Sequence, residues 1–260
     1  MLRYIIFISI GFIACRGVST KSKKHTTPPG TVYFKETLFI DKTEIANVHW
    51  REFQYWALHI KKDTLLYNSI KLDTTVWRNI AKPFESFYHS NPSYNYYPVV
   101  GVSYEQALAF CRFRTEAVNY LFQKEPSSNP FPGKKYLYRL PTKEEWELAA
   151  AGKLNKEQYP YGMTNIVGTK GRFKGYPLFN AKRSDTLQGF GYMSPINSFQ
   201  RNTIGVHNMI GNVSEMIAEK GVAKGGNFEL SADQCKIVDQ QLYQKAERWL
   251  GFRVVCEVVK

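Results

Sequence analysis

Cysteine and histidine are the residue types of this chain that most readily supply a nucleophile or a metal ligand. The 260 residues contain four cysteines and five histidines. No histidine belongs to an H-E-x-x-H pair, and His49 and His59 stand ten residues apart, which does not make a ligand pair on one helix. Residues 221–226 are not followed by the Lys-Ser/Thr of a phosphate-binding loop. We find no Ser-His-Asp or paired-carboxylate pattern, so the cysteines become the first candidates.

The first cysteine follows a short apolar leader. Arg3 precedes an apolar stretch over residues 4–13, and Ala14 and Cys15 come next. This stretch is too short to span a bilayer, which takes about 20 residues, but it suits an export signal. Residues 12–15 resemble a bacterial lipobox, although Leu is more usual than Phe12. We therefore expect a signal peptide over 1–14 and a lipid anchor at Cys15, which places the protein in the periplasm at the outer membrane. An ordinary signal peptide with an incidental cysteine is the alternative.

The composition fits one exported domain with a basic surface. The chain is 43% hydrophobic and 15% aromatic, which suffices for one substantial core. Its formal charge is +13. Such a charge attracts lipid phosphates or an acidic protein face, and the export signal argues against nucleic acid. Residues 15–30 are too polar to fold, so we expect a tether there and a single domain over residues 31–260.

A few regular elements are expected to position the candidate residues. The expected helices open at residues 41–44, at a Ser103–Gln106 capping box and at a Thr142–Glu145 capping box. The expected extended segments are residues 97–102, 221–228 and 252–259. Residues 152–211 are rich in Gly, Pro, Asn and aromatic residues and show weak periodicity. We expect that part to be ordered but irregular.

A series of short motifs occurs in a fixed order from about residue 31 to 258. They are D-K-T-E-I-A-N (41–47), Y-P-V-V-G-V-S (97–103), Q-A-L-A-F-C (106–111), R-L-P-T (139–142), E-W-E (145–147), Y-P-Y-G (159–162), G-N-V-S-E (211–215), G-G-N-F (225–228) and G-F-R (251–253). The ordered set resembles the formylglycine-generating-enzyme family, also called the sulfatase-modifying-factor family. The resemblance implies an α+β, C-type-lectin-like fold with little regular secondary structure.

A closer likeness lies within that family. Residues 73–77, 96–102 and 113–116 resemble the lipoproteins of the Bacteroidetes type IX secretion and gliding machinery. Those proteins use the domain as a structural part of an envelope complex, and the lipobox agrees with this. The resemblance implies envelope protein partners and membrane attachment through the anchor.

The enzymes of the family are copper-dependent oxidases that convert a sulfatase cysteine to formylglycine. They use two cysteines, five residues apart, because soft thiolates suit Cu(I). Aligned from residues 225–226, the first cysteine position falls on Leu230, the second on Cys235, and a serine beside the reaction centre falls on Asn227. Leu230 offers no lone pair, so the resemblance implies vestigial positions without copper. We predict a non-catalytic structural or accessory role. A copper oxidase acting on a cysteine and a lectin-like module for glycans or peptides are the alternatives.

The resemblance also implies a disulfide. In the family, a cysteine at the end of the second helix bonds one just after G-F-R. Cys111 holds the first place, and Cys256 lies two residues beyond the second, where the strand period of two keeps its side chain on the same face. We therefore predict a Cys111–Cys256 bond in an oxidising compartment. Cys235 is then the odd thiol, either a buried relic or the partner of an intermolecular bridge.

A structural calcium site is implied by the family pattern at Asn208, Gly211, Val213 and Glu215. Calcium takes about six to eight hard oxygens, which two side chains and two backbone carbonyls would supply in part. A polar turn in which the asparagine caps backbone groups is the alternative. A second family site has an acidic ligand replaced by Gln188. Its remaining positions are Asn180, Ala181 and Phe190.

Overall fold

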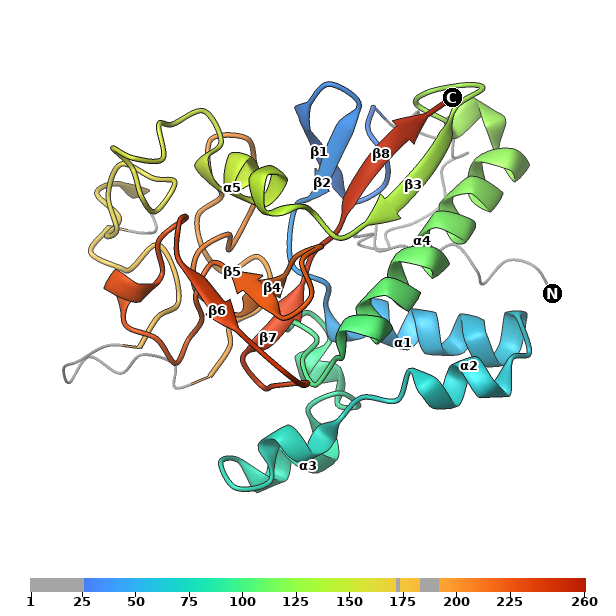
Figure 1. Cartoon of the computed structure of the whole chain (residues 1–260), viewed down its shortest axis with the longest axis horizontal. Coiled ribbons are helices and arrows are strands. Elements are labelled where there is room, and N and C mark those ends of the chain that lie inside the picture. The colour runs from blue at the N-terminus through green and yellow to red at the C-terminus, as the bar shows by residue number, and fades with distance from the viewer. Residues whose placement is uncertain (1–25, 172–173, 183–191) are drawn as a thin grey trace.

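The computed structural model describes residues 26–171, 174–182 and 192–260 (Figure 1). The predicted signal peptide and the Cys15 anchor lie outside the described residues, as do Gln188 and Phe190. The described chain forms two small sheets with helices around them. Among these residues, no helix is both long enough and apolar enough to cross a membrane.

The first sheet has the strand order β1-β2-β8-β3, and every pair in it is antiparallel. Its outer strand β3 is covered by the longest helix, α4, which runs beside it in Figure 1. The Asn119 side chain of α4 donates to the Tyr136 carbonyl at 2.7 Å and accepts from the Tyr136 amide at 3.0 Å. The helix thereby satisfies backbone groups that an open strand edge would expose. The strands are β1 (Thr31–Lys35), β2 (Leu38–Asp41), β3 (Lys135–Arg139) and β8 (Val255–Val259).

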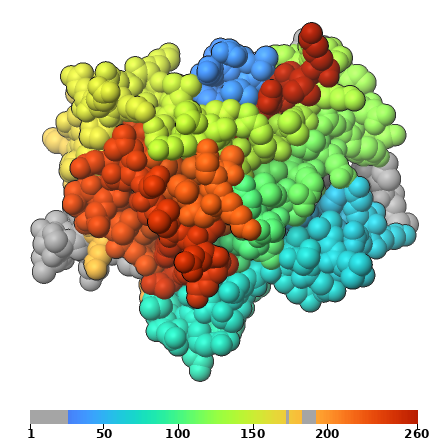
Figure 2. Space-filling view, viewed as in Figure 1, coloured from blue at the N-terminus to red at the C-terminus, as the bar shows by residue number. Residues whose placement is uncertain are grey.

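The second sheet has the order β6-β5-β4-β7, in which only β4 and β7 run parallel. Its orange and red strands cover the front of the molecule beside the green and cyan helical half (Figure 2). Each strand has only three residues. The main role of this sheet is therefore to position the turns that connect its strands. The strands are β4 (Ser214–Met216), β5 (Val222–Lys224), β6 (Gln240–Leu242) and β7 (Leu250–Phe252).

Two of the three predicted helix starts are confirmed. Ser103 caps α4 through the Gln106 amide, and Thr142 caps α5 through the Glu145 amide, in both cases as a capping box. The first helix, however, begins at residue 47 rather than 41. Residues 38–41 form β2, and the Ile45 amide donates to the Phe252 carbonyl at 2.9 Å, so tertiary bonds hold this segment extended. The helices are α1 (Asn47–Tyr55), α2 (Thr64–Ser69), α3 (Lys82–Phe87), α4 (Tyr104–Lys124) and α5 (Lys143–Ala151).

The extended segments are confirmed only in part. Residues 222–224 and 255–259 are strands, but residues 97–102 form no strand and contribute one isolated bridge, between Pro98 and Ala46. Between α5 and β4, the described residues form mainly turns and isolated bridges, as predicted. The α+β character with little regular structure is therefore confirmed.

Aromatic side chains join the helices to the second sheet. Trp50 of α1 stacks on Phe110 of α4 with ring centroids 5.8 Å apart, and both rings contact Phe252 of β7 edge to face. All three side chains are buried. Such rings bury large areas, which compensates for the short strands.

The predicted Cys111–Cys256 disulfide is not formed in the structure, where both residues are buried free thiols. Cys256 lies on β8 opposite Phe39 and Tyr138. Both cysteines belong to the same hydrophobic cluster, which also contains Phe110 and Tyr138.

Candidate functional site

The candidate site is the turn that follows β5. Gly225 and Gly226 have positive φ values of 94° and 69°. A Cβ on Gly226 would lie 2.4 Å from the sulfur of Cys235 and 2.9 Å from its Cα, so only glycine lets the two segments pack. The turn therefore brings Cys235 directly beneath the chain at residue 226.

Cys235 is a buried, apolar-packed thiol. It has no exposed surface and belongs to a core cluster with Trp146 and Ile237, against which Leu230 also packs. Its sulfur lies 3.4 Å from the Ser231 carbonyl. Burial raises the pKa of Cys235 to about 12. The thiol thus remains protonated, and the reactive thiolate is disfavoured. Because Cys235 is buried, it is better explained as a relic of the family site than as the partner of an intermolecular disulfide.

Asn227 and Leu230 lie in the same turn, as the alignment predicted. The Leu230 amide donates to the Asn227 carbonyl at 3.1 Å. The Asn227 side chain donates to the Ser214 hydroxyl at 2.9 Å and accepts from the Glu229 amide at 3.0 Å. Both polar atoms of the Asn227 side chain therefore form hydrogen bonds that stabilise the turn.

A buried ion pair joins Glu215 of β4 to Arg253, which directly follows β7. Arg253 donates from Nε and Nη2 to the two oxygens of Glu215, both at 2.6 Å, and Trp146 donates to Glu215 Oε2 at 2.8 Å. Both ionic side chains are fully buried. Burial alone would lower the pKa of Arg253, but the Glu215 carboxylate outweighs it and raises that pKa. The pair is charge-neutral and tightly hydrogen-bonded.

The match to known proteins covers nearly the whole chain. Residues 2–258 fit the model of the sulfatase-modifying factor enzyme 1-like domain. The chain belongs to this family. The formylglycine-generating-enzyme fold that the motifs implied is thereby confirmed.

Named relatives include both active and inactive proteins. Inactive C-alpha-formylglycine-generating enzyme 2 of Bos taurus is 34% identical over 125 residues, 48% of this chain and 33% of the relative. The formylglycine-generating enzyme of Thermomonospora curvata is 34% identical over 87 residues, 31% of this chain and 27% of the relative. The aligned parts thus span about a third of these curated relatives.

Solved structures share the fold at low identity. The crystal structure of CarF superposes with a TM-score of 0.55 at 20% identity, covering 89% of this chain and 96% of that one. PvdO from Pseudomonas aeruginosa gives a TM-score of 0.51 at 17% identity, covering 92% and 89%. These likenesses extend over almost the full length and concern the fold alone.

The copper site of the family does not fit these residues. Its first thiolate position holds Leu230, and the second holds the protonated thiol of Cys235. Within the described part of the chain, no group of three or more His, Cys, Asp or Glu side chains is placed to hold a metal ion. Cu(I) therefore lacks the pair of soft ligands that it needs here.

The residues expected to bind calcium, Asn208, Gly211, Val213 and Glu215, are brought together by the loop and β4, and the calcium site stays a prediction. Glu215 accepts three hydrogen bonds, two at Oε2 and one at Oε1, and Arg253 neutralises its charge. Asn208 donates to Glu44 at 3.2 Å, while its Oδ1 is a buried acceptor without a hydrogen bond.

The residues expected to form the second calcium site also make contacts within the protein. Asn180 donates to the Tyr192 carbonyl at 2.9 Å, and its own carbonyl accepts from the Asn212 amide at 2.8 Å. Ala181 lies beside it, and the third position, Phe190, lies outside the described residues. Asn180 thus holds the loop at residue 212, and a second calcium site here stays a prediction.

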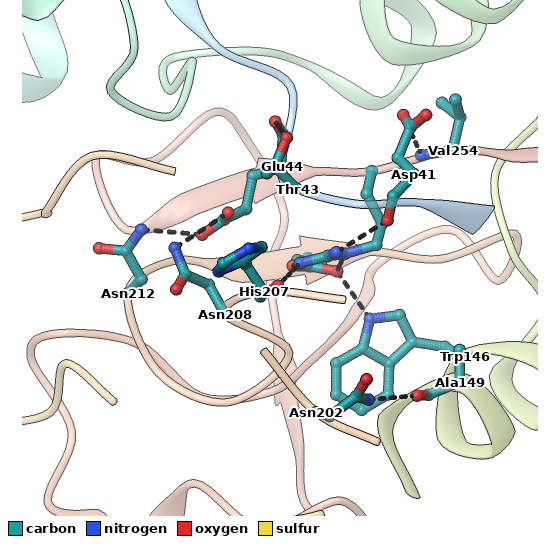
Figure 3. A network of polar contacts seen from close by, with 12 residues as sticks. Asp41, Thr43, Glu44, Trp146, Ala149, Asn202, His207, Asn208, Asn212 and Val254 are labelled. Carbon is teal, nitrogen blue, oxygen red and sulfur yellow. Dashed lines mark hydrogen bonds and ion pairs between the residues drawn. The ribbon is translucent and has the colours of Figure 1, made fainter. Parts of the chain in front are cut away.

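The charged interior was not predicted from the sequence. Glu44 is buried and accepts from Asn212 at 2.8 Å (Figure 3). Burial raises the pKa of Glu44 to about 8, against the opposing effect of Arg253. Each of these charged residues stands in a family motif: Glu44 in 41–47, Glu215 in 211–215 and Arg253 in 251–253. The presence of a charge in all three motifs was the signal that could have revealed the cluster.

Proposed function

We propose that this chain is a non-catalytic member of the family that serves as a structural or accessory component of an envelope secretion or gliding complex. The proposal rests on the identity and burial of the residues at positions 230 and 235. An aliphatic side chain stands where the first thiolate is required, and the remaining thiol is buried with a pKa raised to about 12. Two-thiolate copper chemistry has no basis in this turn.

Relatives support a role without catalysis. The Bos taurus and Mus musculus relatives are named inactive formylglycine-generating enzymes, at 34% and 33% identity. A family that contains such proteins can keep the fold after losing its chemistry. Retention of the fold then favours a binding or scaffolding role.

The envelope role is supported by the sequence. The leader with Cys15 predicts a lipid anchor, and residues 73–77 and 96–102 resemble envelope lipoproteins of the gliding and secretion machinery. The net charge of +13 suits contact with anionic lipid or an acidic protein face.

An oxygen-electrode assay tests the loss of catalysis. The purified protein is loaded with copper and mixed with a cysteine-containing sulfatase peptide. We expect the same oxygen uptake as with a Cys235→Ser variant, and no formylglycine by mass spectrometry. Peptide conversion that requires Cys235 would overturn the non-catalytic proposal.

Affinity purification from solubilised envelopes tests the complex. The tagged chain should recover a reproducible set of envelope proteins, and a Cys15→Ala variant should lose both the membrane fraction and these partners. Deletion of the gene should impair secretion or surface motility. A chain that purifies alone, with secretion and motility unchanged after deletion, would contradict the envelope role.

A further inference from the structure

A cavity of about 570 Å³ opens beside β2, α1 and α4, away from the turn at residues 225–235. None of Asn227, Leu230 and Cys235 lines it. The volume falls within the range of small-molecule sites, about 300–1,000 Å³. The cavity is therefore independent of the vestigial positions.

Aromatic and aliphatic side chains form most of its wall. Tyr97, Phe110 and Phe113 line the cavity, and Tyr96 stands at its rim with 54% of its surface exposed. The Ile196 amide donates to the Tyr96 carbonyl at 2.8 Å, which fixes the loop that closes one side. These rings offer flat faces to an apolar ligand or to a cation.

The inner end of the cavity is formed by a buried ion pair between Asp41 and Arg114. Arg114 Nη1 donates to Asp41 Oδ2 at 2.6 Å, and Arg114 Nη2 donates to the Pro29 carbonyl at 2.8 Å. Asp41 is only 3% exposed, yet its Oδ1 has no hydrogen bond. Gly30 leaves this end open, because a Cβ there would lie 3.0 Å from Arg114 Nη2.

Glu52 supplies an unpaired carboxylate to the wall. It projects from α1 and is partly buried, and its side chain makes no hydrogen bond or ion pair with the described part of the chain. Burial raises the pKa of Glu52 to about 7, and Arg114 and Arg51 oppose this from a distance. A partly buried carboxylate without a partner is costly unless a ligand supplies donors.

We propose that this cavity binds an alkylammonium group, with the ammonium at the carboxylate of Glu52 and the apolar body on the aromatic wall. An ammonium is a donor-only cation, so it matches the unpaired carboxylate of Glu52. An anion would meet both carboxylates, since the Arg114 charge is already paired with Asp41. A neutral group would leave the Glu52 charge uncompensated.

Binding should strengthen as pH rises through about 7, because Glu52 must be ionised to attract the cation. The burial of His49 lowers its pKa to about 3, so its ring is uncharged and adds no repulsion. Arg51 acts on Glu52 from the same helix. The titratable and charged groups that share this cavity with Glu52 are Asp41, Lys42, Glu44, His49, Tyr96, Tyr97 and Arg114.

Isothermal titration of the purified protein with phenethylamine tests the assignment. At pH 8 we expect saturable binding that is at least about tenfold tighter than that of 2-phenylethanol or phenylacetate, and several-fold weaker at pH 6. Glu52→Gln should cost at least about tenfold in affinity without lowering the melting temperature. The matched control is Glu144→Gln, an exposed glutamate on α5, which should bind like the wild type.

A second pair of probes separates the sources of the amine. Acetyl-Phe-Lys-Phe-amide is compared with the peptide that carries norleucine in place of lysine. Preference for the lysine peptide over free phenethylamine assigns the site to a lysine side chain of a polypeptide, and the reverse assigns it to a free amine. Equal binding of cationic and neutral probes, tighter binding of phenylacetate, or no saturable binding at all would overturn the proposal.

Discussion

Arg253 and Glu215 face each other across 38 residues of sequence and form a bidentate ion pair without any solvent exposure. The arginine also donates to the Asp41 carbonyl at 3.2 Å and to the His207 carbonyl at 2.9 Å. One side chain thereby links β2, the loop before β4, and β4 itself. The pair occupies the region where the family pattern predicted calcium.

Removing one member of this pair should strongly destabilise the fold. Arg253→Met leaves a buried carboxylate without its counter-charge, so we expect a loss of about 3–5 kcal/mol in the free energy of unfolding. Urea denaturation followed by circular dichroism measures it. The control is Glu105→Gln, which removes an exposed pair with Lys220 and should cost less than about 1 kcal/mol. Equal effects of the two variants would contradict a central role for Arg253.

Calcium should not stabilise the protein. A ligand that binds the folded state at about 100 times its dissociation constant adds about 2.7 kcal/mol, which a melting curve readily detects. Because Arg253 already neutralises Glu215, we expect equal melting temperatures in excess EDTA and in millimolar calcium chloride. A rise of several degrees with calcium, abolished in Asn208→Ala, would instead confirm the predicted site.

The packing of Gly226 on Cys235 can be tested by adding one methyl group. Gly226→Ala places a Cβ 2.9 Å from the Cα of residue 235, whereas Gly133, with φ of 78°, has no atom within 4 Å of such a Cβ. Both variants bear the strain of a positive φ, about 1–2 kcal/mol. We expect Gly226→Ala to lose at least about 1 kcal/mol more than Gly133→Ala in urea unfolding. Equal losses would place Cys235 elsewhere.

The buried ring of His89 should make the fold sensitive to acid. Burial lowers its pKa from 6.5 to about 3, so the unfolded chain takes up the proton first as pH falls. The stability that depends on this histidine is complete above pH 6.5 and is lost between pH 6.5 and 3. His89→Asn, which can still donate to Asn47, should reduce the loss between pH 7 and 4 by roughly 1–3 kcal/mol. His59→Asn, at an exposed site, should leave the pH profile unchanged.

Local signals account for what the sequence predicted correctly. The caps at Ser103 and Thr142 depend on residues three positions away, so both helix starts could be read from the chain. The turn at residues 225–235 could be placed because Gly225 and Gly226 fix the alignment of Leu230 and Cys235.

Non-local contacts account for what the sequence did not reveal. The end of β2 was predicted to be a helix start. Its strand conformation depends on pairing with β8, whose residues lie more than 200 positions away in the sequence. The Arg253–Glu215 pair and the Asp41–Arg114 end of the cavity likewise join distant segments. Their charges stood in the motifs, but only the fold brings each pair together.

The most direct test of a non-catalytic domain is its affinity for Cu(I), measured by competition with a chromophoric chelator under anaerobic conditions. The wild-type protein should not compete, since Leu230 replaces one ligand and burial keeps the thiol of Cys235 protonated. Leu230→Cys should gain measurable binding, which Leu230→Ser should not. Tight binding of one Cu(I) by the wild type, lost in Cys235→Ser, would contradict the absence of a copper site.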